Sequence, residues 1–342
     1  MFSITRQPRL LVKMVPGSSP RQLMFGASPF ALTSELLFSS IQRAPALGAA
    51  AAPQWHIVGA TQPGDEVNAW DVCHQLITTG FGVAGGATVE FAEPDLEQRW
   101  IFGSETNQAF ALARSGPGAD GPDSNFPSGD TPNWFRDFQH SQLDQARGTI
   151  GEPAANRVII AHFDTGYDPG HSTKPRHLRI DLQRNFVDVD SPNDATDRST
   201  GTMNNLGHGT GTLSILAGNA IAGVPLGGAY ALDVIPIRVA NSVVLFKNSA
   251  IAQAFDYVHG LSQAPQNHVD VITMSMGGLA SQAWAEAVNA LYDLGVFIVT
   301  AAGNNFGNLP THNIVFPARF KRVVAACGVM EDGRPYADLP ID

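Results

Sequence analysis

The sequence has few cysteines, few charged side chains and no long uninterrupted apolar run. Its two cysteines, Cys73 and Cys327, lie far apart in the 342-residue chain. This predicts two reduced thiols, because no Cys-x-x-Cys pair is present to hold zinc and a disulfide would have to join distant segments. No window reaches about 18 consecutive apolar residues, so the sequence predicts no transmembrane helix and no membrane partner.

Basic residues are in the minority, and the N-terminus lacks a leader pattern. Lys and Arg number 21 against 31 Asp and Glu, which gives a formal charge of −10 and argues against a nucleic-acid partner. The first residues contain no apolar stretch followed by a small-residue cleavage site. As written, the sequence therefore predicts a cytoplasmic protein, and a start site further upstream would instead allow secretion. The 44% of hydrophobic residues are enough for a sizeable core.

Residues 1–103 alternate β-like runs with helical periodicity. This alternation predicts a small ferredoxin-like α+β domain. Turn-forming residues dominate 104–132, which we interpret as a flexible linker. The predicted elements of the first domain are strands at Leu10–Val15, Trp55–Ala60 and Ala87–Ala92, and helices at Ala27–Arg43 and Asp65–Gly80.

Residues 133–342 have the pattern of an α/β domain. A helical stretch, Trp134–Arg147, precedes apolar strands that alternate with helices. Continuous apolar strands between helices predict a doubly wound, mostly parallel sheet that is covered on both faces. The predicted strands are Val158–Ala161, Ala231–Val239, Val269–Ser275, Val296–Ala302 and Arg322–Ala326, and the predicted helices are Gly209–Leu216, Ala250–Leu261 and Gln282–Leu294.

Polar residues stand where these strands end and where one helix begins. In an open α/β sheet, the carboxyl ends of the strands share one edge, so we expect these residues to gather there. An imidazole can take a proton from a serine, a buried carboxylate can orient that imidazole, and an amide can donate to an oxyanion. The residues concerned are Asp164, His208 and Asn304, together with the strand end Ser275, Met276, Gly277 and Gly278.

The motifs around these residues resemble those of the subtilisin-like serine peptidases. Residues 158–166 resemble the strand that bears the catalytic Asp, and residues 207–213 resemble the catalytic His motif. Residues 271–278 resemble the strand that pairs with the substrate backbone, and residues 299–304 resemble the motif of the oxyanion Asn. The resemblance implies a serine endopeptidase in which Asp164 orients, His208 acts as the general base and Asn304 donates to the oxyanion.

The N-terminal domain also fits this family. Val89–Asp95 is similar to the last strand of the propeptide that assists the folding of subtilases and inhibits them. The resemblance therefore implies two partners for the catalytic domain, a peptide or protein substrate and the chain's own N-terminal domain. We expect the segment after this strand, Leu96–Gly103, to run toward the edge formed by Ser275–Gly278.

One family feature is missing. Members carry a Gly-Thr-Ser nucleophile motif on a helix after the oxyanion Asn, and the 342 residues contain no Gly-Thr-Ser. We interpret the sequence as a catalytic domain that stops before its serine, so this chain alone is expected to be inactive. The alternative is a noncatalytic pseudopeptidase that binds peptides, or inhibits, through the same groove.

The resemblance implies no required cofactor. Four acidic residues could either bind a structural calcium ion, as loops of relatives do, or form a solvated acidic loop. Three histidines lack zinc-motif spacing and are interpreted as surface or core residues. The acidic residues are Asp188, Asp190, Asp194 and Asp197, and the histidines are His162, His171 and His177.

Overall fold

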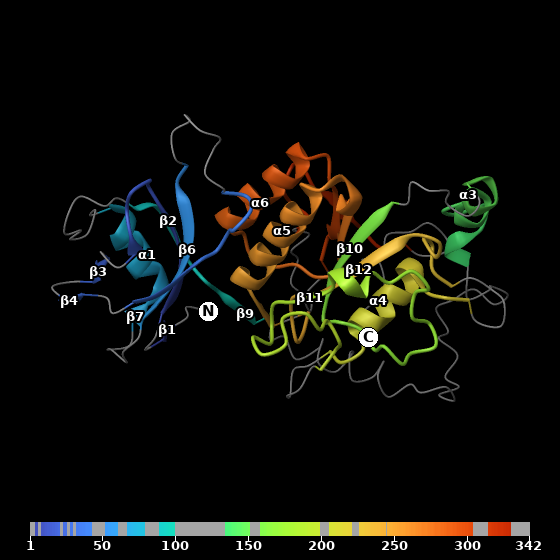
Figure 1. Ribbon diagram of the computed structural model, residues 1–342, viewed down its shortest axis with the longest axis horizontal. Helices are drawn as coiled ribbons and strands as arrows, with labels where there is room; N and C mark the ends of the chain where they lie inside the picture. The colour runs from blue at the N-terminus through green and yellow to red at the C-terminus, as the bar shows by residue number, and fades with distance from the viewer. Residues whose placement is uncertain are drawn as a thin grey trace. The chain divides into compact units, whose positions relative to one another are not determined.

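The computed structural model describes a large part of the chain, in two compact units (Figure 1). The first unit comprises residues 1–98, 246–268 and 279–296, and the second comprises residues 99–245, 269–278 and 297–342. The predicted linker, 104–132, lies outside the described residues. Those residues are 4–5, 8–20, 23–25, 28–29, 32–42, 52–60, 67–78, 89–99, 134–150, 158–198, 205–220, 226–243, 245–303 and 314–329.

The first unit is built on a four-stranded antiparallel sheet in the order β5-β6-β2-β8. Helix α1 (Ala69–Thr78) packs against one face, where Val12 and Met14 of β2 meet Val72 and Leu76. The strands are β2 (Arg9–Met14), β5 (Leu32–Leu36), β6 (Gln54–Ala60) and β8 (Val89–Pro94), and the short pairs are β1 (Ile4–Thr5) with β7 (Val67–Asn68) and β3 (Met24–Phe25) with β4 (Ser28–Pro29).

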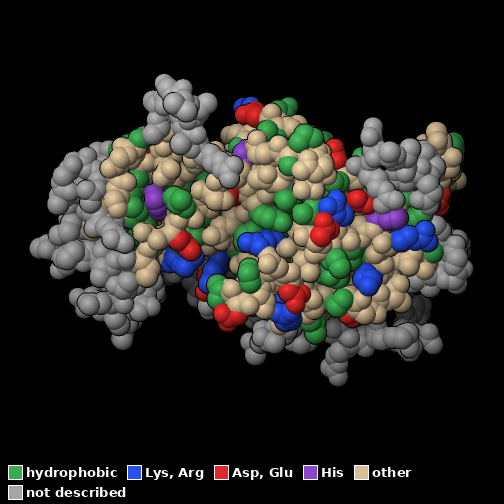
Figure 2. Space-filling model, viewed as in Figure 1, with side chains coloured by type: hydrophobic (Ala, Val, Ile, Leu, Met, Phe, Trp, Pro, Cys, Tyr) green, Lys and Arg blue, Asp and Glu red, His purple; other side chains and the backbone are tan. Residues whose placement is uncertain are grey.

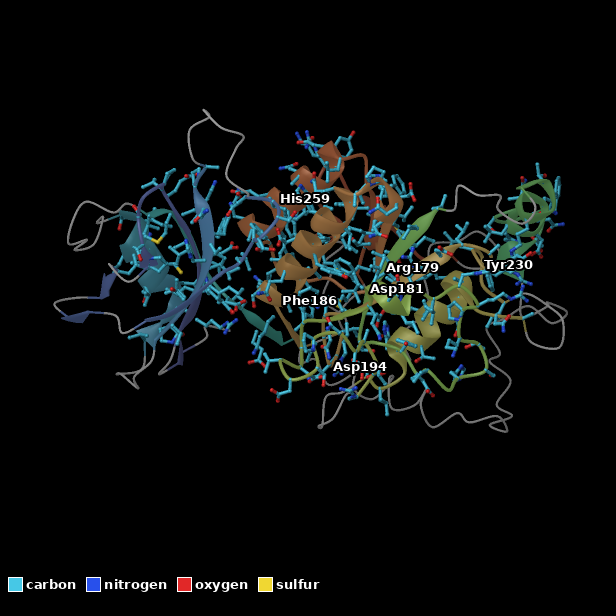
Figure 3. The ribbon with its side chains drawn as sticks, in the orientation of Figure 1. Arg179, Asp181, Phe186, Asp194, Tyr230 and His259 are labelled. Atoms are coloured by element: carbon cyan, nitrogen blue, oxygen red, sulfur yellow. The ribbon has the colours of Figure 1, made fainter. Side chains whose placement is uncertain are left out.

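The other face of this sheet meets α5 (Asn248–Ser262) and α6 (Gln282–Asp293), two helices that lie side by side (Figure 1). The Nε1 atom of Trp55 donates to Glu286 on α6 at 2.9 Å, and Lys13 Nζ donates to the same carboxylate at 3.0 Å. His259, labelled in Figure 3, projects from α5, and its Nδ1 lies 2.9 Å from Ser40 Oγ. The sheet is therefore covered on both faces within one unit.

The predicted helix at Ala27–Arg43 is wrong. Residues 28–29 form β4, and residues 32–36 form β5, which pairs antiparallel with β6. The apolar spacing resembled a helical stripe, but Thr33, Ser34, Glu35 and Leu36 are all exposed on an edge strand. Pairing with β6 satisfies the backbone of this segment and overrides the local periodicity.

Two predicted helix boundaries also needed correction. Helix α1 begins at Ala69 rather than Asp65, because Asn68 Oδ1 accepts a hydrogen bond from the backbone N–H of Trp70 and caps the helix. The predicted helix Trp134–Arg147 is interrupted. A 3₁₀ turn, η2 (Trp134–Arg136), and helix α3 (Leu143–Ile150) are separated by a turn in which Gln142 has a positive φ of 59°.

The second unit contains a six-stranded parallel sheet in the order β11-β12-β10-β14-β15-β16. Helix α4 (His208–Ala217) packs on one face through Leu213 and Ala217. The predicted α/β class with a parallel sheet is confirmed. Its strands are β10 (Ile159–Asp164), β11 (Arg184–Asn185), β12 (Asp233–Arg238), β14 (Val271–Met274), β15 (Phe297–Ala301) and β16 (Val324–Ala326). Outside this sheet, β9 (Glu97–Arg99) pairs with β13 (Leu245–Lys247), and the 3₁₀ turns are η3 (Ile180–Leu182) and η4 (Pro265–Asn267).

One face of the parallel sheet is covered by α4 near β10, but the same face exposes apolar side chains on β15 and β16. The register aligns Ile160, under α4, with Val271 and then with Phe297. Phe297 is 54% exposed and Val324 is 45% exposed, whereas Ile272 and Ile298 on the opposite face are buried. The α4 face therefore carries an uncovered apolar stretch over β15 and β16.

Both thiols are free, as the sequence predicts. Cys73 is buried on α1, where burial raises the pKa of its thiol, and Cys327 is exposed. None of the helices in the described part of the chain is long and apolar enough to cross a membrane. Basic and acidic side chains are interspersed on the face shown in Figure 2.

Candidate active site

Asp164 and His208 come together at the carboxyl edge of the parallel sheet. Asp164 is the last residue of β10, and His208 is the first residue of α4. The Nδ1 atom of His208 lies 2.7 Å from Asp164 Oδ1. The Asp164 side chain is fully buried, whereas 29% of the His208 side chain remains exposed. Because Asp164 holds Nδ1, the other ring nitrogen, Nε2, is the one available to a reacting group.

Glycines allow this close approach. A Cβ on Gly209 would lie 2.0 Å from the carbonyl oxygen of Gly166, so only glycine fits at the second position of α4. Gly207 precedes the helix with a φ of 87°, and Gly166 follows β10 with a φ of 108°. Both values lie in the left-handed region that glycine adopts at little cost. The glycines around His208 therefore seat the start of α4 directly on the turn after Asp164.

Two threonines and a second carboxylate tie the pair to its surroundings. Thr212, one turn along α4 from His208, donates from Oγ1 to Asp164 Oδ2 at 2.9 Å. Thr165 donates from Oγ1 to Asp197 Oδ2 at 3.0 Å and accepts from the backbone N–H of Gly209 at 3.1 Å. Each Asp164 oxygen is therefore hydrogen-bonded, and the loop that carries Asp197 is connected to the start of α4.

The two groups of the pair have opposite pKa shifts. Burial by itself would raise the pKa of Asp164, but the hydrogen bond and charge of His208, the charge of His162 and the Thr165 N–H outweigh it and lower the pKa below 3.8. Burial would lower the pKa of His208, but Asp164 and the charge of Asp197 raise it above 6.5. The arrangement therefore favours a carboxylate beside an imidazolium, the charge state that forms when His208 accepts a proton.

The predicted substrate-binding strand end lies at the same sheet edge. Strands β10 and β14 are in register at Phe163 and Met274, so Asp164 and Ser275 are the next residues on adjacent strands. Gly278 forms an antiparallel bridge with Phe316, in which its N–H donates at 2.7 Å and its carbonyl accepts at 2.9 Å. Met276 is buried, and Gly277 is half-buried between these two points.

Val315 fills the space between two glycines at this edge. A Cβ on Gly277 would lie 2.4 Å from Val315 Cγ2, and one on Gly303, which has a φ of 102°, would lie 2.9 Å from Val315 Cγ1. The two glycines follow the adjacent strands β14 and β15, so the valine packs where the chain leaves both strands. The predicted oxyanion residue, Asn304, lies outside the described residues.

Buried carboxylates of the first unit bind the starts of α5 and α6. Glu93 accepts from the Ser281 hydroxyl at 2.7 Å and from the backbone N–H groups of Gln282 and Ala283 at 2.8 and 3.2 Å. Asp95 accepts from the backbone N–H of Ser249 at 2.8 Å. Both acids belong to the segment 89–95, so its end is held at two helix N-termini, where negative charge is favoured.

Three of the four acidic residues considered for calcium have other partners. Asp188 pairs with Arg238 at 2.8 Å, Asp194 pairs with Arg198, and Asp197 accepts from the Gly207 N–H at 2.8 Å. Asp194 is labelled in Figure 3, on the loop between β11 and α4. Within the described ranges, no group of three or more His, Cys, Asp or Glu side chains could hold a metal ion.

Comparison with known proteins identifies the family of the chain. The model of the subtilase family, Peptidase_S8, matches residues 155–336, more than half of the chain. The chain therefore belongs to the subtilase family.

Individual relatives match over a similar range. The chain is 35% identical over 189 residues to subtilisin DY of Bacillus licheniformis, covering 54% of this chain and 60% of that protein. It is 27% identical over 186 residues to the major intracellular serine protease of Bacillus subtilis strain 168, covering 54% and 53%. A solved structure, "S41 Psychrophilic Protease", has a TM-score of 0.41 at 26% identity, over 50% of this chain and 53% of that one. The chain thus spans little more than half of these relatives.

Sequence reasoning did not connect several surrounding residues with the pair. Thr165, Thr212 and Asp197 hold the pair in place, and His162 lies buried beside it. The signals were weak but present, because Thr212 is four residues after His208 on a predicted helix. His162 is two residues before Asp164 on a strand, so both side chains belong to the same face.

Proposed function

We propose that this chain is part of a serine endopeptidase that hydrolyses peptide bonds with an Asp-His-Ser triad. The observation that carries the proposal is the 2.7 Å hydrogen bond between the fully buried Asp164 and the partly exposed His208. Membership of the subtilase family supports it, because the family match includes both residues.

In this mechanism His208 acts as the general base. Asp164 holds the Nδ1–H, so Nε2 takes the proton from the attacking serine hydroxyl and later gives it to the leaving amine. Asp164 stays ionised throughout and stabilises the imidazolium. The side-chain amide of Asn304 is proposed to donate to the oxyanion of the tetrahedral intermediate. The backbone of Ser275–Gly278 is proposed to pair with the peptide substrate.

The nucleophile is proposed to lie outside residues 1–342. Two observations support this: the sequence contains no Gly-Thr-Ser, and the chain spans little more than half of its curated relatives. The uncovered apolar stretch around Phe297 and Val324 also needs a partner, since parallel sheets are normally covered on both faces. A serine-bearing helix on that stretch would lie over the same sheet face as α4.

We also propose that residues 1–103 act as a propeptide-like folding and inhibitory domain. The support is the way Glu93 and Asp95 occupy the starts of α6 and α5, with Glu286 bound by Lys13 and Trp55 in return. A parallel sheet needs many long-range contacts before it is stable, so a preformed partner for two of its connecting helices would assist folding. The predicted course of Leu96–Gly103 stays a prediction, because residues 100–103 lie outside the described part.

The proposed chemistry needs no cofactor. Any calcium ion would be structural, and a chelator is then expected to change the unfolding temperature without changing the hydrolytic rate of the folded enzyme. A hydrolytic rate that depends directly on added metal would contradict this part of the proposal.

The decisive experiment is active-site labelling with a fluorophosphonate probe, which reacts only with an activated serine. The 342-residue chain is expected to give no labelling. A chain continued through the following codons is expected to label, and to lose that labelling in His208→Ala. A continued chain with no Gly-Thr-Ser helix, or labelling that persists in His208→Ala, would remove the proposed triad.

A second candidate function is noncatalytic peptide binding or inhibition through the same groove. The absence of Gly-Thr-Ser from the 342 residues favours it. Fluorescence polarisation with labelled peptides distinguishes the two functions, because a binding protein must retain affinity without hydrolysis. No binding at millimolar peptide would count against this candidate.

A further inference from the structure

A second histidine lies behind the Asp164–His208 pair. His162 is on β10, two residues before Asp164, and only 3% of it is exposed. Its Nε2 atom lies 3.0 Å from Thr212 Oγ1 and 3.9 Å from Asp164 Oδ2. The first distance is that of a hydrogen bond, and the second is too long for one. His162 therefore reaches Asp164 through the hydroxyl of Thr212.

The direction of this chain follows from counting protons. A threonine hydroxyl has one proton to donate. Ionised Asp164 can only accept, so Thr212 donates to its Oδ2 at 2.9 Å. The hydroxyl must then accept from His162, which places a proton on Nε2 of that ring. His162 therefore donates to the Thr212 hydroxyl, which donates to Asp164 Oδ2, while His208 donates to Asp164 Oδ1.

Thr212 has competing acceptors for its single proton. The backbone carbonyl oxygens of His208 and Gly209 lie 3.3 and 3.2 Å from Oγ1, which is the usual bond of a threonine inside a helix. A donor at Nε2 of His162 occupies a lone pair of the hydroxyl and so restricts how it can rotate. Without that donor, the hydroxyl is free to turn toward the helix backbone, and Asp164 Oδ2 loses its hydrogen bond.

We propose that His162 is a positioning residue of the catalytic pair, which acts by holding the Thr212 hydroxyl on Asp164 and thereby fixing the rotation of the carboxylate toward His208. That the Asp164–His208 pair is catalytic rests on the proposed function. The contacts among His162, Thr212 and Asp164 are independent of it. The charged and titratable groups around the carboxylate are His208 and His162, with Asp197 acting on His208 from the neighbouring loop.

The charge state of His162 agrees with this role. Burial lowers the pKa of His162 below 6.5; the charge of Asp164 opposes this lowering without cancelling it, and the charge of His208 adds to it. A neutral ring near pH 7 keeps one N–H to donate without placing a second positive charge beside the pair. Asp164 is then left with His208 as the cation that it stabilises.

The test measures the His208 Nδ1 proton by NMR in the 342-residue chain, so hydrolysis is not needed. The resonance is assigned by its disappearance in His208→Asn. In His162→Phe, solvent exchange of this proton is expected to become about tenfold faster, as for one lost hydrogen bond. The pH at which the resonance disappears on acidification is expected to rise, because a carboxylate with one donor fewer has a higher pKa.

A matched set of variants separates positioning from packing. His162→Gln keeps an N–H donor and is expected to stay near the wild type, whereas Thr212→Val should reproduce His162→Phe. The double variant His162→Phe/Thr212→Val should show no larger effect than Thr212→Val alone, because both changes break the same chain.

Three results would overturn the proposal: an unchanged Nδ1 proton in folded His162→Phe, additive effects in the double variant, or His162→Gln behaving like His162→Phe. If His162→Phe does not fold, the comparison of His162→Gln with Thr212→Val and Thr212→Ser decides. Exchange that is fast in Thr212→Val but unchanged in the other two supports the proposal, and the opposite pattern refutes it. Absence of a serine in a continued chain would refute the proposed function and leave these results unaffected.

Discussion

Two buried carboxylates in this molecule have opposite pKa shifts. Asp164 is fully buried and Glu93 is 6% exposed, so burial by itself would raise the pKa of each carboxyl group. For Asp164 the imidazole of His208 reverses the effect. For Glu93 the donors are the Ser281 hydroxyl and two neutral backbone N–H groups, which do not outweigh burial and the negative charge of Asp95. A cationic partner, rather than the number of hydrogen bonds, decides whether a buried acid stays ionised.

The contrast separates the contact of Asp164 with His208, which belongs to the proposed reaction, from the contact of Glu93 with the start of α6, which holds the first unit together. Asp164 must remain charged to stabilise an imidazolium, and its partners on α4 supply that condition. Glu93 only has to accept from the first turn of α6, and a carboxylate with a raised pKa gives up this charge at milder acidity. Each prediction below alters one side of this comparison.

The largest effect is expected from Asp164→Asn in a chain that includes the nucleophile. The amide cannot hold His208 in the required tautomer, so turnover should fall by about 10⁴-fold, a magnitude borrowed from the same exchange in an unrelated serine peptidase. Stopped substrate-hydrolysis assays at saturating peptide measure it. A loss of less than about tenfold would mean that Asp164 does not orient the base.

A smaller effect on the proposed reaction is expected from Asn304→Ala. Removing the proposed oxyanion donor should lower turnover by about 10²–10³-fold with little change in substrate binding, a range taken from the loss of one oxyanion-hole donor in subtilisin. Separate determination of kcat and KM checks this split. An unchanged kcat would exclude Asn304 from the oxyanion role.

Stability should depend strongly on which glycine of α4 is replaced. Gly209→Ala places a Cβ 2.0 Å from the Gly166 carbonyl oxygen, so we expect a loss of about 3 kcal/mol or more in unfolding free energy. Gly211→Ala is the matched control on the same helix, with nothing within 4 Å of its Cβ, and should stabilise by about 0.5–1 kcal/mol. Urea denaturation of both variants measures the difference. Equal effects would contradict the close seating of α4 on the Asp164 turn.

On the other side of the comparison, Glu93→Ala removes the acceptor at the start of α6. Leaving these donors without a partner should cost about 2 kcal/mol. Glu90→Ala on the same strand is the control, since the side chain of Glu90 is 42% exposed and pairs with Lys13 at 2.8 Å. Its loss should stay below about 1 kcal/mol. Comparable losses in urea denaturation would mean that the cap contributes little.

The pair itself could be predicted from the sequence, because each member stands in a short motif with its own backbone requirement. Asp164 ends an apolar strand, His208 begins a helix between glycines, and the parallel sheet brings strand ends to one edge. Thr212 and Asp197 could not be found this way, since their contacts depend on how α4 and a loop of the second unit pack. The sequence placed His162 among surface or core residues, and only the structure reveals what it touches.

The first unit was harder to predict for a related reason. Apolar spacing in residues 27–43 matched a helix, yet residues 32–36 pair as an edge strand beside β6. Periodicity reports one buried face of a helix, whereas four consecutive residues of β5, Thr33 to Leu36, are exposed. In the parallel sheet β10, β12, β14, β15 and β16 are apolar, so the same method identified these five strands, although their ends shifted by a few residues. The short polar strand β11 was not predicted.

The smallest effect concerns pH and the raised pKa of Glu93. Between its ordinary value of 4.5 and its higher value in the folded chain, the folded state binds more protons at this site than the unfolded state. The contribution of Glu93 to the free energy of unfolding should therefore decrease as the pH rises through this window, and level off above it. Glu93→Gln removes the titration but keeps an oxygen acceptor. The difference in unfolding free energy between wild type and Glu93→Gln should be most favourable to the wild type at low pH. A difference that instead grows as the pH rises would mean that the helix start lowers the pKa of Glu93, and the contrast with Asp164 would fail.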